Sequence, residues 1–143
     1  MSVARTTARL LASPRDAWLV ARMFAWSLVL PALKFALPLP RLVRLAASPR
    51  RVARDAGRET AVAEHAARVY RHRRDDNCLE RSLVTYRYLG RSGAEPRLIV
   101  GMRAADKFGH VWVTTDGAAV HDAPQFLAQL EPLFEFDAAG NRV

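Results

Sequence analysis

The chain of 143 residues is long enough for one domain with a buried core and too short for two full ones. Half of the residues are hydrophobic and a quarter are charged, the balance of an ordinary globular protein. The single cysteine excludes an internal disulfide framework and a cysteine-based zinc site, and it fits a reducing cytoplasm.

The formal net charge of +8 is unevenly distributed along the chain. Residues 1–74 hold 15 Lys/Arg and 4 Asp/Glu, whereas residues 75–143 hold 7 and 10. A basic half can bind nucleic acid, an anionic membrane or an acidic protein. The arginines are nevertheless scattered, with no dense tract and no aromatic-interleaved RNA motif, so we expect a solvated basic surface rather than nucleic-acid binding.

The N-terminal half is predicted to be helical. Ser13 is a candidate N-cap and Pro14 fits the first helical position, so a largely apolar helix is expected to run to about Leu30, before Pro31. A second helix is expected over residues 50–72. Its apolar face is formed by residues at helical spacing: Val62, Ala66, Val69 and Tyr70.

The stretch "WLVARMFAWSLVLPALKFALPLP" (18–40) is apolar enough to raise the question of a membrane span. Its longest charge-free run falls short of the roughly 18 residues that a span needs, because polar residues and prolines interrupt it: Arg22, Pro31, Lys34 and Pro38. It also fits a secretory signal poorly. We expect a buried helix or helix pair that does not span, with peripheral membrane contact as the alternative.

The segment "CLERSLVTYRYLGRSG" predicts a helix that begins at Cys78 and is ended by Gly90 or Gly93. The residues before it can supply a capping oxygen: Asp75, Asp76 and Asn77. Three strands are then expected, over 97–102, 110–115 and 118–122. The fold class is therefore predicted as α+β, with a basic helical region (1–74) and a helix-plus-antiparallel-sheet core (75–143) in one compact domain.

The loop between the last two strands decides whether His110 and Asp122 meet. A two-residue loop, 116–117, would place them on opposite faces of the sheet. A three-residue loop, 115–117, would set them directly opposite each other and would use Gly117 in its left-handed third position. We predict the three-residue loop.

Cys78 at a helix N-terminus is expected to favour its thiolate form, because unpaired N–H groups and the helix dipole stabilise an anion there. A thiolate nucleophile needs a base and an acceptor that orients the base, and these roles fit His110 and Asp122. Trp112 shares the face of His110 and either shields the pair from water or simply packs in the core. Asn77 could support an oxyanion beside the Cys78 N–H. The alternative is that Cys78 is an unreactive residue of the core. Neither interpretation of Cys78 implies a metal.

The segment from about residue 77 to 123 resembles the transglutaminase-like cysteine peptidases that remove leader peptides from lasso-peptide precursors. The order and spacing of Cys78, His110 and Asp122 match that family, as does the context "CLERSLVTYRYL…FGHVWVTTDG…VHD". Further matches are Arg81, Leu83 and Gly101. One departure is His-Val-Trp, where His-Ala-Trp is commoner.

The resemblance implies a transglutaminase/papain-like core and a Cys-His-Asp peptidase that acts as a stand-alone protein, because residues 1–74 lack the hairpin-rich pattern of the family's recognition domain. Its expected partners are the precursor leader peptide, a separate leader-recognition protein and an ATP-dependent macrolactam cyclase. The resemblance implies no bound cofactor. It does imply that activity depends on ATP when the protein is in complex with the cyclase. The protein is expected in the cytoplasm, and association with the membrane surface is the alternative that stays open.

Two other functions stay open from the sequence. A transglutaminase-like amide transfer or deamidation would use the same triad with a different acceptor. A non-catalytic helical adaptor in a maturation complex would leave Cys78 buried and unreactive.

Overall fold

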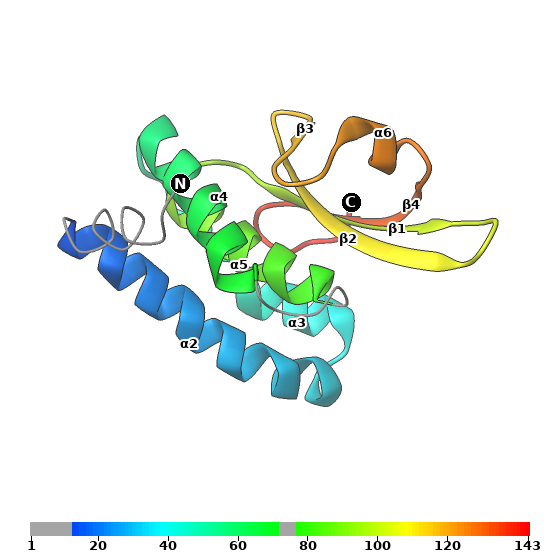
Figure 1. Ribbon diagram of the computed structural model, residues 1–143, viewed down its shortest axis with the longest axis horizontal. Coiled ribbons are helices and arrows are strands. Elements are labelled where there is room, and N and C mark those ends of the chain that lie inside the picture. The colour runs from blue at the N-terminus through cyan, green and yellow to red at the C-terminus, as the bar shows by residue number, and fades with distance from the viewer. Residues whose placement is uncertain (1–12, 72–76) are drawn as a thin grey trace.

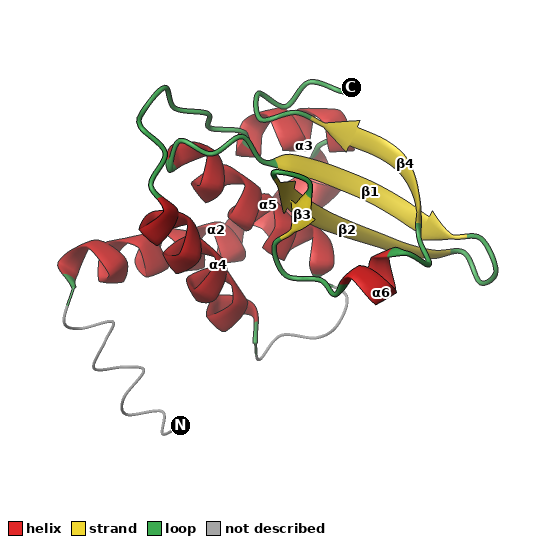
Figure 2. Cartoon of the chain, turned by 90° about the horizontal axis from the view of Figure 1, so that it is seen from above, coloured by secondary structure: helices red, strands yellow, loops and turns green. Residues whose placement is uncertain are grey.

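Most of the helices lie on one side of the protein and a four-stranded antiparallel sheet lies on the other (Figures 1 and 2). The computed structural model describes residues 13–71 and 77–143. The predicted α+β class is confirmed. The proposed capping residues Asp75 and Asp76 and the end of the helix predicted over 50–72 lie outside the described residues.

The first described helix, α2 (Pro14–Ala36), begins as predicted and ends later than predicted. Ser13 is its N-cap, and its hydroxyl accepts a hydrogen bond from a backbone N–H in the first turn at 3.4 Å. The predicted end near Leu30 is wrong, because Pro31 lies inside the helix. A proline there costs about 3 kcal/mol, and burial of apolar side chains such as Leu30, which is 1% exposed, opposes that cost.

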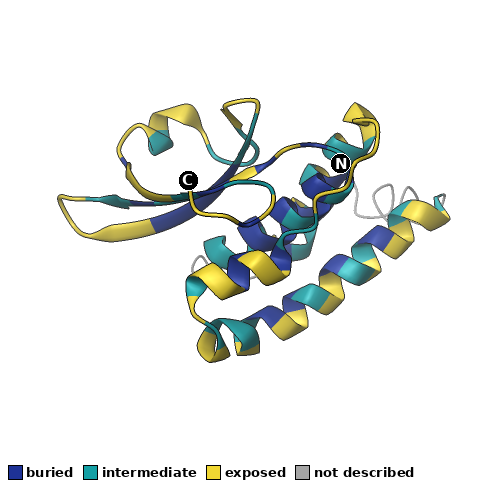
Figure 3. Cartoon of the chain, turned by 180° about the vertical axis from the view of Figure 1, so that it is seen from behind, coloured by how far each residue is buried: buried dark blue, intermediate teal, exposed yellow. Residues whose placement is uncertain are grey.

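Of the described helices, only α2 is long and apolar enough to cross a membrane by length and composition. This differs from the expectation drawn from its short charge-free run. Only 22% of its most apolar window is buried inside the protein. Figure 3 shows exposed stretches along the outer side of α2. The large apolar residues of α2 that are exposed are Trp18, Phe24, Leu28, Val29 and Phe35. The helix nevertheless docks on the rest of the protein, since Lys34 lies 3.2 Å from the buried carboxylate of Glu80.

Three further helices complete the helical side: α3 (Leu39–Ala46), α4 (Ala56–Tyr70) and α5 (Cys78–Arg91). The sequence did not predict α3, because the prolines around its start were read as breaks, whereas proline is well tolerated in a first helical turn. The predicted start of α4 at residue 50 is wrong, because Asp55 caps it by accepting the N–H of Arg58 at 3.2 Å. The predicted end of α5 is confirmed, with Gly93 in the left-handed region at φ 87°.

The sheet has the strand order β3-β2-β1-β4. Its strands are β1 (Arg97–Arg103), β2 (Phe108–Thr115), β3 (Ala118–Ala119) and β4 (Glu131–Phe136), and a short helix, α6 (Pro124–Leu127), precedes β4. The first two predicted strands are confirmed, but the third is much shorter than predicted. β4 was not predicted for two reasons. It is a mostly exposed edge strand without a clear alternation of apolar and polar residues, and it contains Pro132, which is tolerated only at a sheet edge.

The helix α5 is the centre of the fold, between the sheet and the other helices (Figure 1). Nine of its residues are buried, because it packs against β2 on one side and against α2 and α4 on the other. The hydroxyl of Ser82, one turn into α5, donates to the buried carbonyl of Val111 on β2 at 3.0 Å. This bond fixes the start of α5 against the middle of β2.

We expect Gly101→Ala to destabilise the protein by about 1–3 kcal/mol, because a Cβ at this position has no space. It would lie 2.7 Å from Cη2 of Trp112 and 2.9 Å from the backbone oxygen of Glu131. Urea denaturation measures the loss. Gly109→Ala on the neighbouring strand is the matched control, since its Cβ would meet no atom within 4 Å. Equal stability of the two variants would contradict this packing.

Candidate active site

Cys78 is the first residue of α5 and is half-buried. Asn77 occupies the N-cap position, but its side chain makes no capping hydrogen bond, so the expectation that its oxygen caps the helix is wrong. The Nδ2 atom of Asn77 is buried and has no hydrogen-bond partner. Cys78 therefore follows a residue with an unpaired amide donor, and its thiol lies at the N-terminus of a helix, where backbone N–H groups point outward.

His110 lies on β2 and is 8% exposed. Its Nε2 atom is 3.2 Å from Oδ1 of Asp122, within ion-pair distance although not aligned as a hydrogen bond. The imidazole and the Cys78 thiol are close enough to shift each other's pKa. Since Nε2 faces the carboxylate, Nδ1 is the nitrogen left for the thiol. The structure thus brings together Cys78, His110 and Asp122, from a helix, a strand and a loop.

The hairpin reaches this arrangement by a different route from the one predicted. Thr114 pairs with Ala119 and Thr115 with Ala118, so the loop has two residues and the predicted three-residue loop is wrong. Both loop residues have positive φ, as a type I′ Asp-Gly turn requires. Beyond Ala119 the strand ends.

The early end of β3 explains how Asp122 still reaches His110. The N–H of Val120 donates to Val113 at 3.0 Å, and after this bond the chain leaves the sheet in a series of bends. Residues outside the ladder no longer alternate between its faces. The carboxylate can therefore approach the histidine from a position that regular pairing would forbid.

Three aromatic rings surround the imidazole of His110. Phe108 and Trp112 are stacked parallel to it, with ring centroids 6.3 and 6.1 Å away, and Phe126 meets it edge-on at 5.1 Å. The predicted position of Trp112 on the same face is confirmed. Phe108 was missed although it has the same two-residue spacing, and Phe126 was missed because nothing local in the sequence connects α6 to β2. These rings hold the imidazole and keep water from it.

Arg81 is the second contact of the acid. Its Nη2 atom lies 3.6 Å from Oδ1 of Asp122, and it stands nearly one turn after Cys78 on α5. The neighbouring His121 anchors the same loop, with Nε2 2.9 Å from the carbonyl of Ala63 on α4. One helix thus provides the thiol and a cation that holds the carboxylate in place.

The electrostatics favour a thiolate–imidazolium pair. The carboxylate of Asp122 and then the thiol of Cys78 raise the pKa of His110 to about 9, although burial opposes the shift. Burial raises the pKa of the Cys78 thiol, but hydrogen bonds from His110 and from the backbone of Val111 bring it below its ordinary value. The pKa of Asp122 is also lowered: burial raises it, and the contact with His110 and the charges of His110 and Arg81 outweigh that effect.

This arrangement provides an activated sulfur, a group that can carry a proton and an acceptor that fixes the orientation of that group. It is suited to attack on an amide carbonyl. Within 13–71 and 77–143, no group of three or more His, Cys, Asp or Glu side chains could hold a metal ion.

The comparisons with known proteins give one match. A family model described as the transglutaminase-like superfamily matches residues 19–135, well over half of the chain and on both sides of the boundary predicted at residue 74. No curated protein and no solved structure matches the chain. Cysteine peptidases and amide transferases are typical of this superfamily. The chain therefore belongs to the transglutaminase-like superfamily.

Proposed function

We propose that this protein is a cysteine peptidase that removes the leader peptide from a lasso-peptide precursor. The observation that carries the peptidase proposal is the position of His110, whose Nε2 lies 3.2 Å from Asp122 and whose imidazole lowers the pKa of the Cys78 thiol. The leader-peptidase assignment is supported by the Cys-Leu-x-Arg-Ser-Leu and His-x-Trp-Val patterns, which start at Cys78 and His110.

In the first half of the reaction, the thiolate of Cys78 attacks the carbonyl carbon at the junction of leader and core. The carbon–sulfur bond forms, and the carbonyl oxygen becomes an oxyanion. The tetrahedral intermediate collapses when His110 donates its proton to the leaving amine. The carbon–nitrogen bond then breaks and leaves the leader as a thioester on Cys78.

In the second half, His110 takes a proton from water, and the resulting hydroxide attacks the thioester. The carbon–sulfur bond breaks, the leader leaves as a carboxylic acid that loses its proton to solvent, and the Cys78 thiolate is restored beside the protonated His110. Asp122 keeps the imidazole in one orientation and stabilises its charged form in both halves.

We expect Asn77→Ala to lower kcat by about 10²–10³-fold with little change in KM, because loss of one oxyanion donor has this effect on acyl transfer. The buried Nδ2 atom of Asn77, the residue that precedes Cys78, has no hydrogen-bond partner and is the candidate donor, together with the Cys78 N–H. Steady-state kinetics of leader cleavage measure the change.

Asn141→Ala is the matched control, since this asparagine is exposed and lies in the C-terminal segment. A rise in KM at unchanged kcat for Asn77→Ala would contradict the oxyanion role, and so would an equal loss in both variants.

The function is tested by incubating the protein with a precursor peptide and a leader-recognition protein in ¹⁸O-labelled water. The peptidase proposal predicts a free leader with ¹⁸O in its new carboxylate and a core with a free amine, both seen by mass spectrometry. An amine-linked leader in the presence of added amine would instead indicate amide transfer. No product from the wild type, with the same result for Cys78→Ala, would indicate a non-catalytic adaptor.

The proposal includes the partners that this chemistry requires. A separate recognition protein would present the leader, and the freed N-terminal amine of the core is the nucleophile that an ATP-dependent macrolactam cyclase would use next. We place this complex in the cytoplasm, where a free thiol stays reduced.

A further inference from the structure

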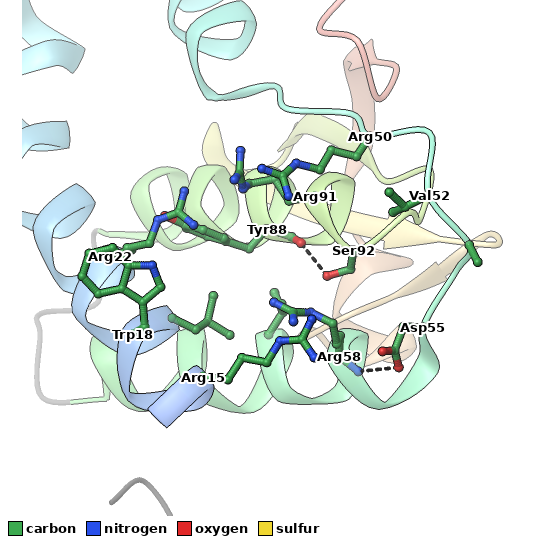
Figure 4. Close-up of a pocket in the computed structure, with 13 residues that line it drawn as sticks. Arg15, Trp18, Arg22, Arg50, Val52, Asp55, Arg58, Tyr88, Arg91 and Ser92 are labelled. Atoms are coloured by element: carbon green, nitrogen blue, oxygen red, sulfur yellow. Dashed lines mark hydrogen bonds between the residues drawn. The ribbon is translucent and has the colours of Figure 1, made fainter. Parts of the chain in front are cut away.

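A cavity of about 400 Å³ lies between α2, α4, the end of α5 and the segment around residue 52 (Figure 4). Five arginines line it: Arg15, Arg22, Arg50, Arg58 and Arg91. Figure 4 shows guanidinium groups entering from opposite sides. The carboxylate in the lining belongs to Asp55, which already accepts the backbone N–H of Arg58 as the cap of α4.

The positive charges of this cavity are not neutralised by the described part of the chain, in which none of the five arginines forms an ion pair. Arg91 donates to the hydroxyl of Ser48 at 3.1 Å, and Arg22 lies over the ring of Tyr88 at 5.3 Å. Burial, and then the charges of Arg22, Arg50 and Arg87, lower the pKa of Arg91. An anion in the cavity would relieve this repulsion.

The shape and charge of the cavity favour phosphate over other anions. A guanidinium group forms paired hydrogen bonds with phosphate oxygens, and several such groups around a small volume match one compact, multiply charged ligand. A phosphate monoester carries about −1.5 to −2 at pH 7, whereas each carboxylate carries only one charge. The hydroxyl of Tyr88, which belongs to the lining, is buried without a hydrogen-bond partner.

The cavity is separate from the site of the thiol. Tyr88, Arg91 and Ser92 line it at the C-terminal end of α5, whereas Cys78 is at the N-terminal end. At 1.5 Å per residue, these ends are about 20 Å apart. A ligand bound in the cavity would therefore be too far from Cys78 to contain the bond that is cleaved.

We propose that the arginine cavity binds a doubly charged phosphate group that bridges α2, α4 and α5. Such a group has two sources. It is the end of a soluble phosphate or diphosphate compound, or it is the headgroup of a lipid. The second source suits the position of Trp18, which lines the cavity and is 66% exposed at one end of the apolar outer side of α2.

Binding of inorganic pyrophosphate to the full chain, measured by isothermal titration calorimetry at fixed ionic strength, tests the proposal. We expect saturable binding that Arg22→Gln with Arg58→Gln weakens by about tenfold or more, since each replacement removes charged hydrogen bonds to the phosphate oxygens. The matched control is Arg41→Gln with Arg71→Gln, two exposed arginines outside the cavity, which should bind as the wild type does. Absence of saturable binding, or equal loss in both double variants, would overturn the proposal.

Sedimentation with phosphatidylcholine vesicles that contain phosphatidic acid distinguishes the two sources. The lipid source is supported if the wild type binds these vesicles, pyrophosphate reverses the binding and the Arg22/Arg58 variant does not bind. Pyrophosphate binding without vesicle binding supports a soluble ligand. A glutamate-rich peptide that binds through the same arginines more tightly than pyrophosphate would overturn the phosphate assignment in favour of an acidic protein partner.

Discussion

Replacement of Cys78 by alanine is expected to lower the rate of leader cleavage by about 10⁶-fold, because loss of the nucleophile from a triad removes nearly all of its catalytic effect. Cys78 is half-buried at the start of α5, so a small side chain there leaves the fold in place. Single-turnover assays with excess enzyme measure the residual rate.

Cys78→Ser is the matched control for this experiment, since it keeps the size of the side chain and exchanges the thiolate for a weak nucleophile. Both variants should melt near the wild-type temperature and both should be inactive. Cleavage by Cys78→Ala at a rate near that of the wild type would show that another group attacks the amide.

Replacement of Asp122 by asparagine is expected to lower kcat by about 10⁴-fold, the effect of losing the acceptor that orients a catalytic histidine. The same variant should change the pH dependence. The thiolate–imidazolium pair exists between the two apparent pKa values of the coupled groups, and the upper one depends on the carboxylate that raises the pKa of His110 to about 9. In Asp122→Asn the alkaline limit of activity should therefore move to lower pH.

The stability of Asp122→Asn gives an independent measurement of the same contact. His110 has a raised pKa in the folded protein, so its contribution to stability is complete below the ordinary value of 6.5 and is lost as the pH rises through about 9. Urea unfolding at several pH values should show this loss in the wild type and a weaker one in Asp122→Asn. An unchanged alkaline limit and an unchanged slope of stability would contradict the contact between His110 and Asp122.

The parts of the site that the sequence could predict rest on local signals. The polar run of Asp75, Asp76 and Asn77 predicted the start of α5 at Cys78, and the segment "HVWVTT" predicted the strand of His110. The meeting of Cys78, His110 and Asp122 was predicted from the chemistry of a triad and from the family pattern. His110 and Asp122 lie 3.2 Å apart in the structure, although the hairpin beneath them differs from the predicted one. The catalytic roles of the three residues stay a prediction.

The register shows why local geometry could not place the acid. The prediction assumed that the strand continued to Asp122, so that face alternation decided which loop was allowed. In the structure the Asp-Gly pair forms its preferred two-residue turn, and β3 ends at Ala119. The end of a short edge strand depends on what the next segment packs against, here Phe126 against Phe108 and His110. A single strand's sequence does not contain that information.

Other features depend on contacts between segments that are far apart in the chain. The sequence could not show that the side-chain amide of Asn77 is unpaired, because an asparagine at this position normally caps the helix, and only the structure shows that it does not. The arginines of the cavity were read as a solvated surface, because they are scattered over residues 15–91 and only the packing of α2, α4 and α5 collects them. Scattered charges in a sequence therefore do not exclude a concentrated site.

The pH dependence of Cys78 alkylation by iodoacetamide, compared between the wild type and His110→Ala, tests the central claim most directly. If the thiol and the imidazole form a catalytic pair, the wild-type thiol reacts with an apparent pKa below the ordinary value of about 8.5, and this pKa rises when His110 is lost. A thiol that is unreactive in both proteins, or that reacts with the same pH dependence in both, would contradict the pair and the peptidase function built on it.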